Sequence, residues 1–178
     1  MNIAPLSATQ RARRVKLMIF DVDGVLTDGG LRYGPEGELI KTFNVLDGHG
    51  IKLLQQNGVK TGIISARQSP IVTRRAADLG ISVLLQSVHD KRSAFERTAE
   101  EAGVPHGECG FMGDDVIDLP VMLRVGFAVS VPNGHPEVTR RAHYVTRAAG
   151  GRGAVREVCD FILRAQDKYE AALAPYLA

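Results

Sequence analysis

Short apolar runs alternate with amphipathic segments along almost the whole chain, and this alternation limits the fold more than any other feature. The apolar runs lie at residues 16–20, 59–64, 81–85, 109–112, 126–129 and 142–145. Helical patterns fill the stretches between them, at about 48–57, 70–79, 91–102, 117–124 and 153–172. Short apolar strands joined by helices form βαβ units and parallel sheets. The sequence therefore predicts an α/β fold built on a doubly wound parallel sheet.

Composition fits a single domain. The chain has 178 residues, of which 44% are hydrophobic and 24% charged, the balance of a globular protein with a sizeable core. A net charge of +2 gives no bulk electrostatic case for nucleic-acid binding. The apolar runs, such as residues 17–20, are too short to span a bilayer, and no apolar segment like that of a secretory signal follows Met1. Cys109 and Cys159 form no CxxC pair, so we expect a reduced, cytoplasmic protein that binds neither membrane nor nucleic acid.

Two segments stand outside the alternation. Residues 1–14 are polar and arginine-rich, and are expected to form a loose lead-in to a single domain spanning 1–178. Residues 30–43 place Pro35-Glu36-Gly37 between two short extended runs, which predicts an inserted β-hairpin. An exposed hairpin tends to aggregate unless it is paired or covered. We expect it to serve as a lid, as an oligomer contact, or as both.

Asp21 and Asp23 follow the first predicted strand and precede glycines. Alternate strand residues face the same way, so both carboxylates can converge on one small volume. Like charges so close together need a metal cation, a proton or both. That combination suits phosphoryl transfer with an aspartate nucleophile. A plain turn, in which Asp and Gly are common, is the alternative.

Three further groups of reactive residues follow predicted strands: Ser65 with Arg67; Lys91; and Asp114, Asp115 and Asp118. Ligands of open parallel sheets bind beyond the carboxyl ends of the strands, where all of these should meet. Each group also has a simpler explanation. A serine often bonds its own turn, a lysine can be a surface residue, and acidic residues commonly open helices. Alternatively, three carboxylates within five positions form a site for a hard cation such as Mg²⁺.

In this order and spacing, the groups resemble the haloacid dehalogenase-like phosphohydrolase superfamily over nearly the whole chain. The resemblance implies that Asp21 is the nucleophile and Asp23 the acid and base. It implies Mg²⁺ held by Asp21, Asp114 and the main-chain carbonyl of Asp23. Ser65 and Lys91 would stabilise the phosphoryl group, while Asp115 and Asp118 would support the metal shell and orient Lys91. Asp23 points to a phosphatase or phosphomutase, because transport ATPases of the superfamily carry Thr there.

A narrower resemblance is to the capless 3-deoxy-D-manno-octulosonate 8-phosphate phosphatases. It rests on residues 20–29, 43–51, 64–67 and 144–157. It implies homotetramers whose neighbouring subunits cover the sites, and a role in making the sugar acid of the lipopolysaccharide inner core. The substrate-binding residues expected on this basis, and from the need for cations around an acidic sugar phosphate, are Asp23, Asn44, Val45, Leu46, Asp47, Gly48, Lys52, Arg67, Arg75 and Lys91. Leu46 and Lys52 depart from the arginines of some members. The glycine-rich loop around Arg152 is either a hinge or a contact with an adjoining subunit.

Two alternatives stay open. One is another enzyme of the superfamily, either a phosphatase for a related nine-carbon sugar acid phosphate or a phosphomutase. The other, from a different class, is a non-catalytic protein that binds a phosphate ligand or acts in assembly. Both Asp21 and Asp23 are present, which favours an enzyme, because function is argued from the site and not from the fold.

Overall fold

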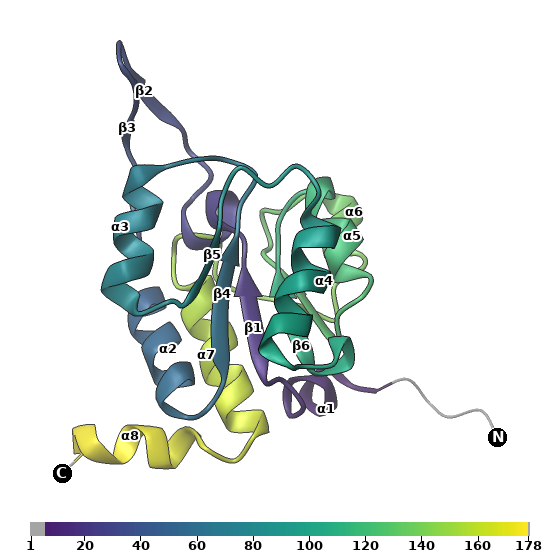
Figure 1. The fold of residues 1–178 in the computed structure, drawn as a ribbon. Coiled ribbons are helices and arrows are strands. Elements are labelled where there is room, and N and C mark those ends of the chain that lie inside the picture. Colours follow the sequence, from purple (N-terminus) through teal and green to yellow (C-terminus); the bar gives the residue numbers. More distant parts are fainter. Residues whose placement is uncertain (1–5, 178) are drawn as a thin grey trace.

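A six-stranded sheet with helices on both faces forms the centre of the computed structural model, which describes residues 6–177 (Figure 1). The strand order is β5-β4-β1-β6-β7-β8, and every neighbouring pair is parallel. The strands are β1 (Leu17–Phe20), β4 (Lys60–Ile64), β5 (Val83–Leu85), β6 (Cys109–Met112), β7 (Phe127–Ser130) and β8 (Tyr144–Val145). The predicted doubly wound parallel sheet is confirmed.

The helices divide between the two faces of the sheet. The longer ones are α2 (Val45–Gln56), α3 (Pro70–Leu79), α4 (Lys91–Ala102) and α7 (Ala154–Ala165), and the shorter ones are α1 (Ala8–Ala12), α5 (Leu119–Met122), α6 (Pro136–Thr139) and α8 (Tyr169–Leu177). Single helical turns lie at η1 (Val22–Leu26), η2 (His106–Glu108) and η3 (Val116–Asp118). Helices α2, α3 and α7 cover one face, and α4, α5 and α6 the other (Figure 1).

Strand β1 shows why the sheet lies at the centre of the core. All four of its residues are buried. Met18 and Phe20 pack into the cluster beneath α2, α3 and α7, while Leu17 and Ile19 pack into the cluster beneath α4, α5 and α6. Because successive strand residues point to opposite faces, a strand covered on both sides must be apolar throughout. In the sequence this apolar run ends directly before Asp21. The end of β1 therefore determines the position of the Asp21 carboxylate.

Helices α2 and α7 pack against each other unusually closely, and Gly50 makes this possible. A Cβ atom at Gly50 would lie 3.2 Å from the Cα of Arg156 and 3.2 Å from the Cβ of Cys159. Side chains in a packed interior have little room to adjust. The lack of a side chain at Gly50 therefore sets the distance between two helices that approach the site from different parts of the sequence.

The predicted hairpin is confirmed as β2 (Arg32–Gly34) and β3 (Gly37–Ile40), an antiparallel pair. It projects away from the body of the domain, above the carboxyl ends of the strands (Figure 1). Four of its large apolar side chains are exposed: Leu31, Tyr33, Leu39 and Ile40. Among residues 6–177, the connections between β1, β4 and β6 contain no further inserted domain.

Two expectations about the ends of the chain are wrong. Residues 8–12, expected in a loose lead-in, form α1, which Ser7 and Gln10 cap reciprocally and which buries Ala12. Residues 1–5 of that lead-in lie outside the described residues. The single final helix at 153–172 is two helices, because Asp167 takes a left-handed conformation (φ 58°) that ends α7 before α8 begins. No described helix is both long and apolar enough to cross a membrane.

Candidate active site

The strand register brings the reactive residues to one edge of the sheet. Strand β1 lies between β4 and β6, with Phe20 opposite Ile63 on one side and Met112 on the other. The N–H of Asp21 continues this ladder by donating to the carbonyl of Met112 over 3.0 Å. Ser65 follows β4 directly, and Asp114 follows β6 after one glycine. These residues therefore meet where ligands of parallel sheets bind.

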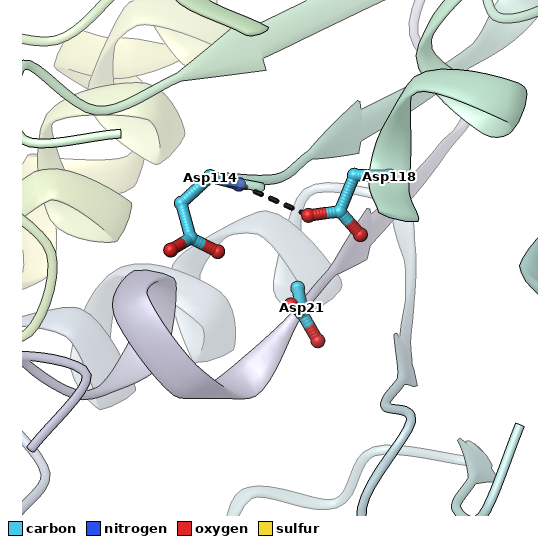
Figure 2. A group of neighbouring side chains, drawn as sticks. All are labelled: Asp21, Asp114 and Asp118. Atoms are coloured by element: carbon cyan, nitrogen blue, oxygen red, sulfur yellow. Dashed lines mark hydrogen bonds between the residues drawn. The ribbon is translucent and has the colours of Figure 1, made fainter. Parts of the chain in front are cut away.

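Three carboxylates form the centre of the site: Asp21, Asp114 and Asp118 (Figure 2). One oxygen from each lies within 4.8 Å of the others. Asp21 and Asp118 are buried, and Asp114 is partly buried. Asp118 accepts the backbone N–H groups of Asp114 (3.0 Å) and Asp115 (3.2 Å), which fixes the turn that follows β6. The cluster contains Asp21 and Asp114 as expected, and adds Asp118 as a third close carboxylate.

Lys91 bridges two of these carboxylates. Its Nζ lies 3.0 Å from Oδ1 of Asp21 and 2.6 Å from Oδ1 of Asp118, and all three side chains are almost completely buried. Burial alone would lower the pKa of Lys91, but the two carboxylates overcome this and raise it. Lys91 is therefore held as a cation between Asp21 and Asp118.

The three carboxylates of the cluster share one lysine, so their negative charge is only partly neutralised. Burial, then the nearby charge of Asp118, raise the pKa of Asp21 to about 7, against the opposing effect of Lys91. Burial, then Asp118 and Asp115, raise the pKa of Asp114 to about 7. Oδ1 of Asp114 is buried and finds no hydrogen-bond partner among residues 6–177. Carboxylate oxygens are the ligands that Mg²⁺ prefers, so Asp21 and Asp114 fit a divalent cation at this position.

Asp23 leaves the strand direction in the turn that follows β1. This turn needs Gly24, whose φ is +91° and whose missing Cβ leaves room for the Asp114 carboxylate. The Asp23 carboxylate lies against two cations, accepting a hydrogen bond from Lys41 and facing Nε of Arg67 at 3.6 Å. Asp23 is not a member of the group formed by Asp21, Asp114 and Asp118.

Ser65 and Arg67 occupy the loop after β4. Ser65 is buried, and its hydroxyl accepts the N–H of Arg67 over 3.3 Å. The Arg67 guanidinium donates to the hydroxyl of Tyr33 on the hairpin and lies 5.8 Å from the centre of that ring. The structure therefore places Arg67 between the hairpin and Asp23.

The expected substrate-contacting segment, residues 44–48, opens helix α2. Asn44 caps the helix by accepting the N–H of Leu46, and the side chains of Val45 and Leu46 are exposed. Asp47 points the other way: it is 1% exposed and its carboxylate accepts N–H groups of α7. The Asp47 carboxylate therefore caps α7.

The two expected helix cations take different positions. Arg75, on α3, lies against the segment before α2: its guanidinium is 5.7 Å from the centre of the Phe43 ring and donates to the carbonyl of Asn44 over 3.5 Å. A side chain at Gly48 would overlap that guanidinium. Lys52 is exposed on α2. The structure brings Arg75, but not the charge of Lys52, into packed contact with this segment.

The hairpin contributes residues that sequence reasoning missed. Lys41 contacts Asp23, Glu38 contacts Lys41 at 2.9 Å, and Ser69 donates a hydrogen bond to Glu38. The contacts of Lys41 with Asp23 and of Ser69 with Glu38 join segments that are far apart in the sequence, and a pattern of neighbouring residues cannot predict them. The one signal in the sequence is the charged pair three residues apart within an otherwise short extended run. Asp115 has a local role, since its carboxylate caps η3 by accepting the N–H of Val116.

Comparison with known proteins agrees with this geometry. Residues 80–158 match the family model of haloacid dehalogenase-like hydrolases. The 3-deoxy-D-manno-octulosonate 8-phosphate phosphatase of Yersinia pestis is 47% identical over 163 residues, covering 92% of this chain and 87% of that protein. The chain belongs to the 3-deoxy-D-manno-octulosonate 8-phosphate phosphatase family of haloacid dehalogenase-like hydrolases.

Solved structures of this phosphatase family share the whole fold. One is the phosphatase from Moraxella catarrhalis in complex with magnesium, phosphate and KDO, with a TM-score of 0.92 and 41% identity, covering 95% of this chain and 97% of that chain. A probable YrbI family phosphatase from Pseudomonas syringae has a TM-score of 0.94 and 48% identity, covering 96% of this chain and 97% of that chain. The likeness thus extends over nearly the whole chain.

Proposed function

We propose that this protein is a Mg²⁺-dependent phosphatase that removes phosphate from 3-deoxy-D-manno-octulosonate 8-phosphate. The observation that carries the proposal is the position of Lys91 between two carboxylates. This lysine holds the buried carboxylates of Asp21 and Asp118 beside the unpartnered oxygen of Asp114. This arrangement suits a nucleophile, a cation site and a fixed positive charge in one small volume. The family membership supports the same reaction and substrate class.

In the proposed reaction, a carboxylate oxygen of Asp21 attacks phosphorus as the bond to the sugar oxygen breaks, giving an aspartyl phosphate. Asp23 gives its proton to the leaving oxygen. It then takes a proton from the water that attacks the aspartyl phosphate, which releases phosphate and restores Asp21. Ser65 and Lys91 stabilise charge on the phosphoryl oxygens.

Asp21, Asp114 and the main-chain carbonyl of Asp23 would hold Mg²⁺. Bound there, the cation would offset the charge of the carboxylates and of the phosphoryl group. The clustered carboxylates and the partnerless oxygen of Asp114 support this assignment.

The substrate also carries a carboxylate, which needs a cation of its own. Arg67 lies at 3.6 Å from Asp23 and Arg75 packs against the segment before α2, so both are proposed to bind the sugar acid with residues 44–48 and Lys52. A related nine-carbon sugar acid phosphate is the alternative substrate. On the basis of the family resemblance, we also propose that the enzyme acts in the synthesis of the lipopolysaccharide inner core.

The proposed assembly is a homotetramer whose neighbouring subunits close the sites. The projecting hairpin supports it, because Leu31, Tyr33, Leu39 and Ile40 are exposed on it and large apolar patches mark interaction surfaces. The proposed compartment is the cytoplasm, which the two buried free cysteines, Cys109 and Cys159, support.

The test is release of phosphate from 3-deoxy-D-manno-octulosonate 8-phosphate, from a nine-carbon sugar acid phosphate and from glucose 6-phosphate, with Mg²⁺ or with EDTA. We expect Mg²⁺-dependent release from the first substrate, lost about a thousand-fold or more in Asp21→Asn. Asp78→Asn, on the exposed surface of α3, is the control that should keep full activity. No Mg²⁺-dependent release from either acidic sugar phosphate would overturn the proposal, and an active Asp21→Asn would overturn the mechanism.

A further inference from the structure

Lys41 is a buried lysine at the base of the hairpin. Its side chain is only 2% exposed, and two carboxylates hold it: Asp23 and, at 2.9 Å, Glu38. Lysine is almost never fully buried unless it is paired, and its long side chain loses much rotamer freedom on burial. A buried ion pair is weak evidence for a stabilising role, because desolvation offsets the attraction. The position of Lys41 beside Asp23 therefore suggests a role in function.

The Asp23 carboxylate has cations on two sides. Lys41 donates to Oδ1, and Nε of Arg67 lies 3.6 Å from Oδ2. The two cations come from segments on either side of α2, one after the hairpin and one after β4. With both oxygens faced by fixed charges, the carboxylate has one preferred orientation.

Glu38 links this arrangement to the hairpin and to α3. It lies on β3, accepts a hydrogen bond from Lys41, and accepts another from the hydroxyl of Ser69. Ser69 is the residue that caps α3, and its hydroxyl accepts the N–H of Val72. Glu38, and through it Lys41, is therefore linked both to the hairpin and to the start of α3.

We propose that Lys41 is a positioning residue for the phosphatase reaction: its ammonium, held by Glu38, orients the Asp23 carboxylate for proton transfer to the leaving oxygen. This inference rests on the proposed function. Proton transfer requires the donor to be within hydrogen-bond reach of the leaving group, so a freely rotating Asp23 would deliver its proton less often. Glu38 acts one step further away, through Lys41.

The leaving group distinguishes this role from a structural one. A sugar alkoxide needs a proton as it departs, whereas p-nitrophenolate departs readily without one. The ratio kcat/KM covers the steps up to the first irreversible one, so it reports on departure of the leaving group and not on hydrolysis of the aspartyl phosphate. Loss of Asp23 positioning should therefore lower kcat/KM for the sugar phosphate far more than for p-nitrophenyl phosphate.

The experiment compares Lys41→Met with the wild type on both substrates at saturating Mg²⁺. We expect kcat/KM to fall about 100-fold or more with 3-deoxy-D-manno-octulosonate 8-phosphate, but less than about 10-fold with p-nitrophenyl phosphate. Lys41→Arg, which keeps the charge, should recover most of the loss. The control is Lys16→Met, which also removes a lysine paired with a carboxylate (Glu108, 2.7 Å), at the other end of β1.

Equal losses on the two substrates would overturn the inference, as would no loss on either. If Lys41→Met does not fold, Glu38→Gln is the deciding variant, because it leaves the lysine in place. We expect a smaller loss of kcat/KM, which is again larger with the sugar phosphate than with p-nitrophenyl phosphate. An equal loss on the two substrates contradicts the inference. A wild type inactive on every acidic sugar phosphate counts against the proposed function. An active wild type with an unbiased Lys41→Met counts against the role of Lys41 alone.

Discussion

The carboxylate of Asp47 accepts a hydrogen bond of 2.8 Å from the backbone N–H of Arg156, which lies 109 residues further along the chain. Its other oxygen accepts the N–H of Gly153 over 3.4 Å. Gly153 stands at the N-cap of α7 and has no side chain to cap the helix itself. A residue of α2 therefore supplies the cap of α7, where the first N–H groups of a helix otherwise lack partners.

Replacing Asp47 with alanine should destabilise the fold. The substitution leaves the partly buried N–H groups of Gly153 and Arg156 without their helix-capping partner, which costs about 0.5–2 kcal/mol in the free energy of unfolding. Urea denaturation measures the loss as a lower midpoint. Asp78→Ala is the matched control, since its exposed pair with Arg74 should change stability by no more than about 0.5 kcal/mol. Unchanged stability with a raised KM would instead assign the Asp47 side chain to substrate binding.

The sequence predicts the sheet and the reactive strand ends because both depend on local patterns. The apolar run at 17–20 marks a doubly covered strand, and Asp21 follows it directly. Once the strands are parallel neighbours, Ser65 and Asp114 must lie beside Asp21.

Contacts between distant segments could not be predicted in this way. Nothing in the sequence near Asp47 indicates the cap of a helix 109 residues away, and nothing near Lys41 indicates contact with Asp23. The break at Asp167 was also missed, because an amphipathic pattern continues on both sides of it and a non-glycine residue with positive φ is uncommon. These features depend on tertiary packing and not on a local period.

Removing one carboxylate of the cluster should stabilise the metal-free protein. In Asp114→Asn, the like charges of Asp21, Asp114 and Asp118 are reduced by one, so thermal unfolding in EDTA near pH 8 should occur at a higher temperature than in the wild type. Adding Mg²⁺ should stabilise the wild type, by about 2.7 kcal/mol at one hundred times its Kd, and should barely change the variant.

Asp115→Asn is the control for the metal response. Its carboxylate caps η3 through the N–H of Val116, so the variant should keep most of the Mg²⁺-dependent shift. A full Mg²⁺ response in Asp114→Asn would remove Asp114 from the cation site.

Lys91→Met should destabilise the protein strongly, because it leaves Asp118 as a buried charge without its cation. Removing one partner of a buried pair costs about 3–5 kcal/mol. Adding Asp118→Asn should return much of that stability in the double variant, which urea denaturation measures against both single variants. Phosphate release should not recover, because the charge that Lys91 presents beside Asp21 is still missing. Simple addition of the two destabilising effects would show that Lys91 and Asp118 do not act as a pair.

Glu157 should make the stability of the fold depend on pH in the acid range. Burial opposes its charged form, but the N–H groups of Ala148 and Arg147 and the hydroxyl of Tyr144 donate to it and lower its pKa below the usual 4.5. A carboxyl group whose folded pKa is lowered stabilises the fold above its unfolded pKa, and this contribution is lost as pH falls through the folded value. The wild type should therefore exceed Glu157→Gln most clearly near pH 7. Urea denaturation at steps down to about pH 3 should show the difference shrinking only below about pH 4.5. Tyr144→Phe, which removes one of the three donors, should give an intermediate slope, and a difference that stays constant across this range would contradict the assignment.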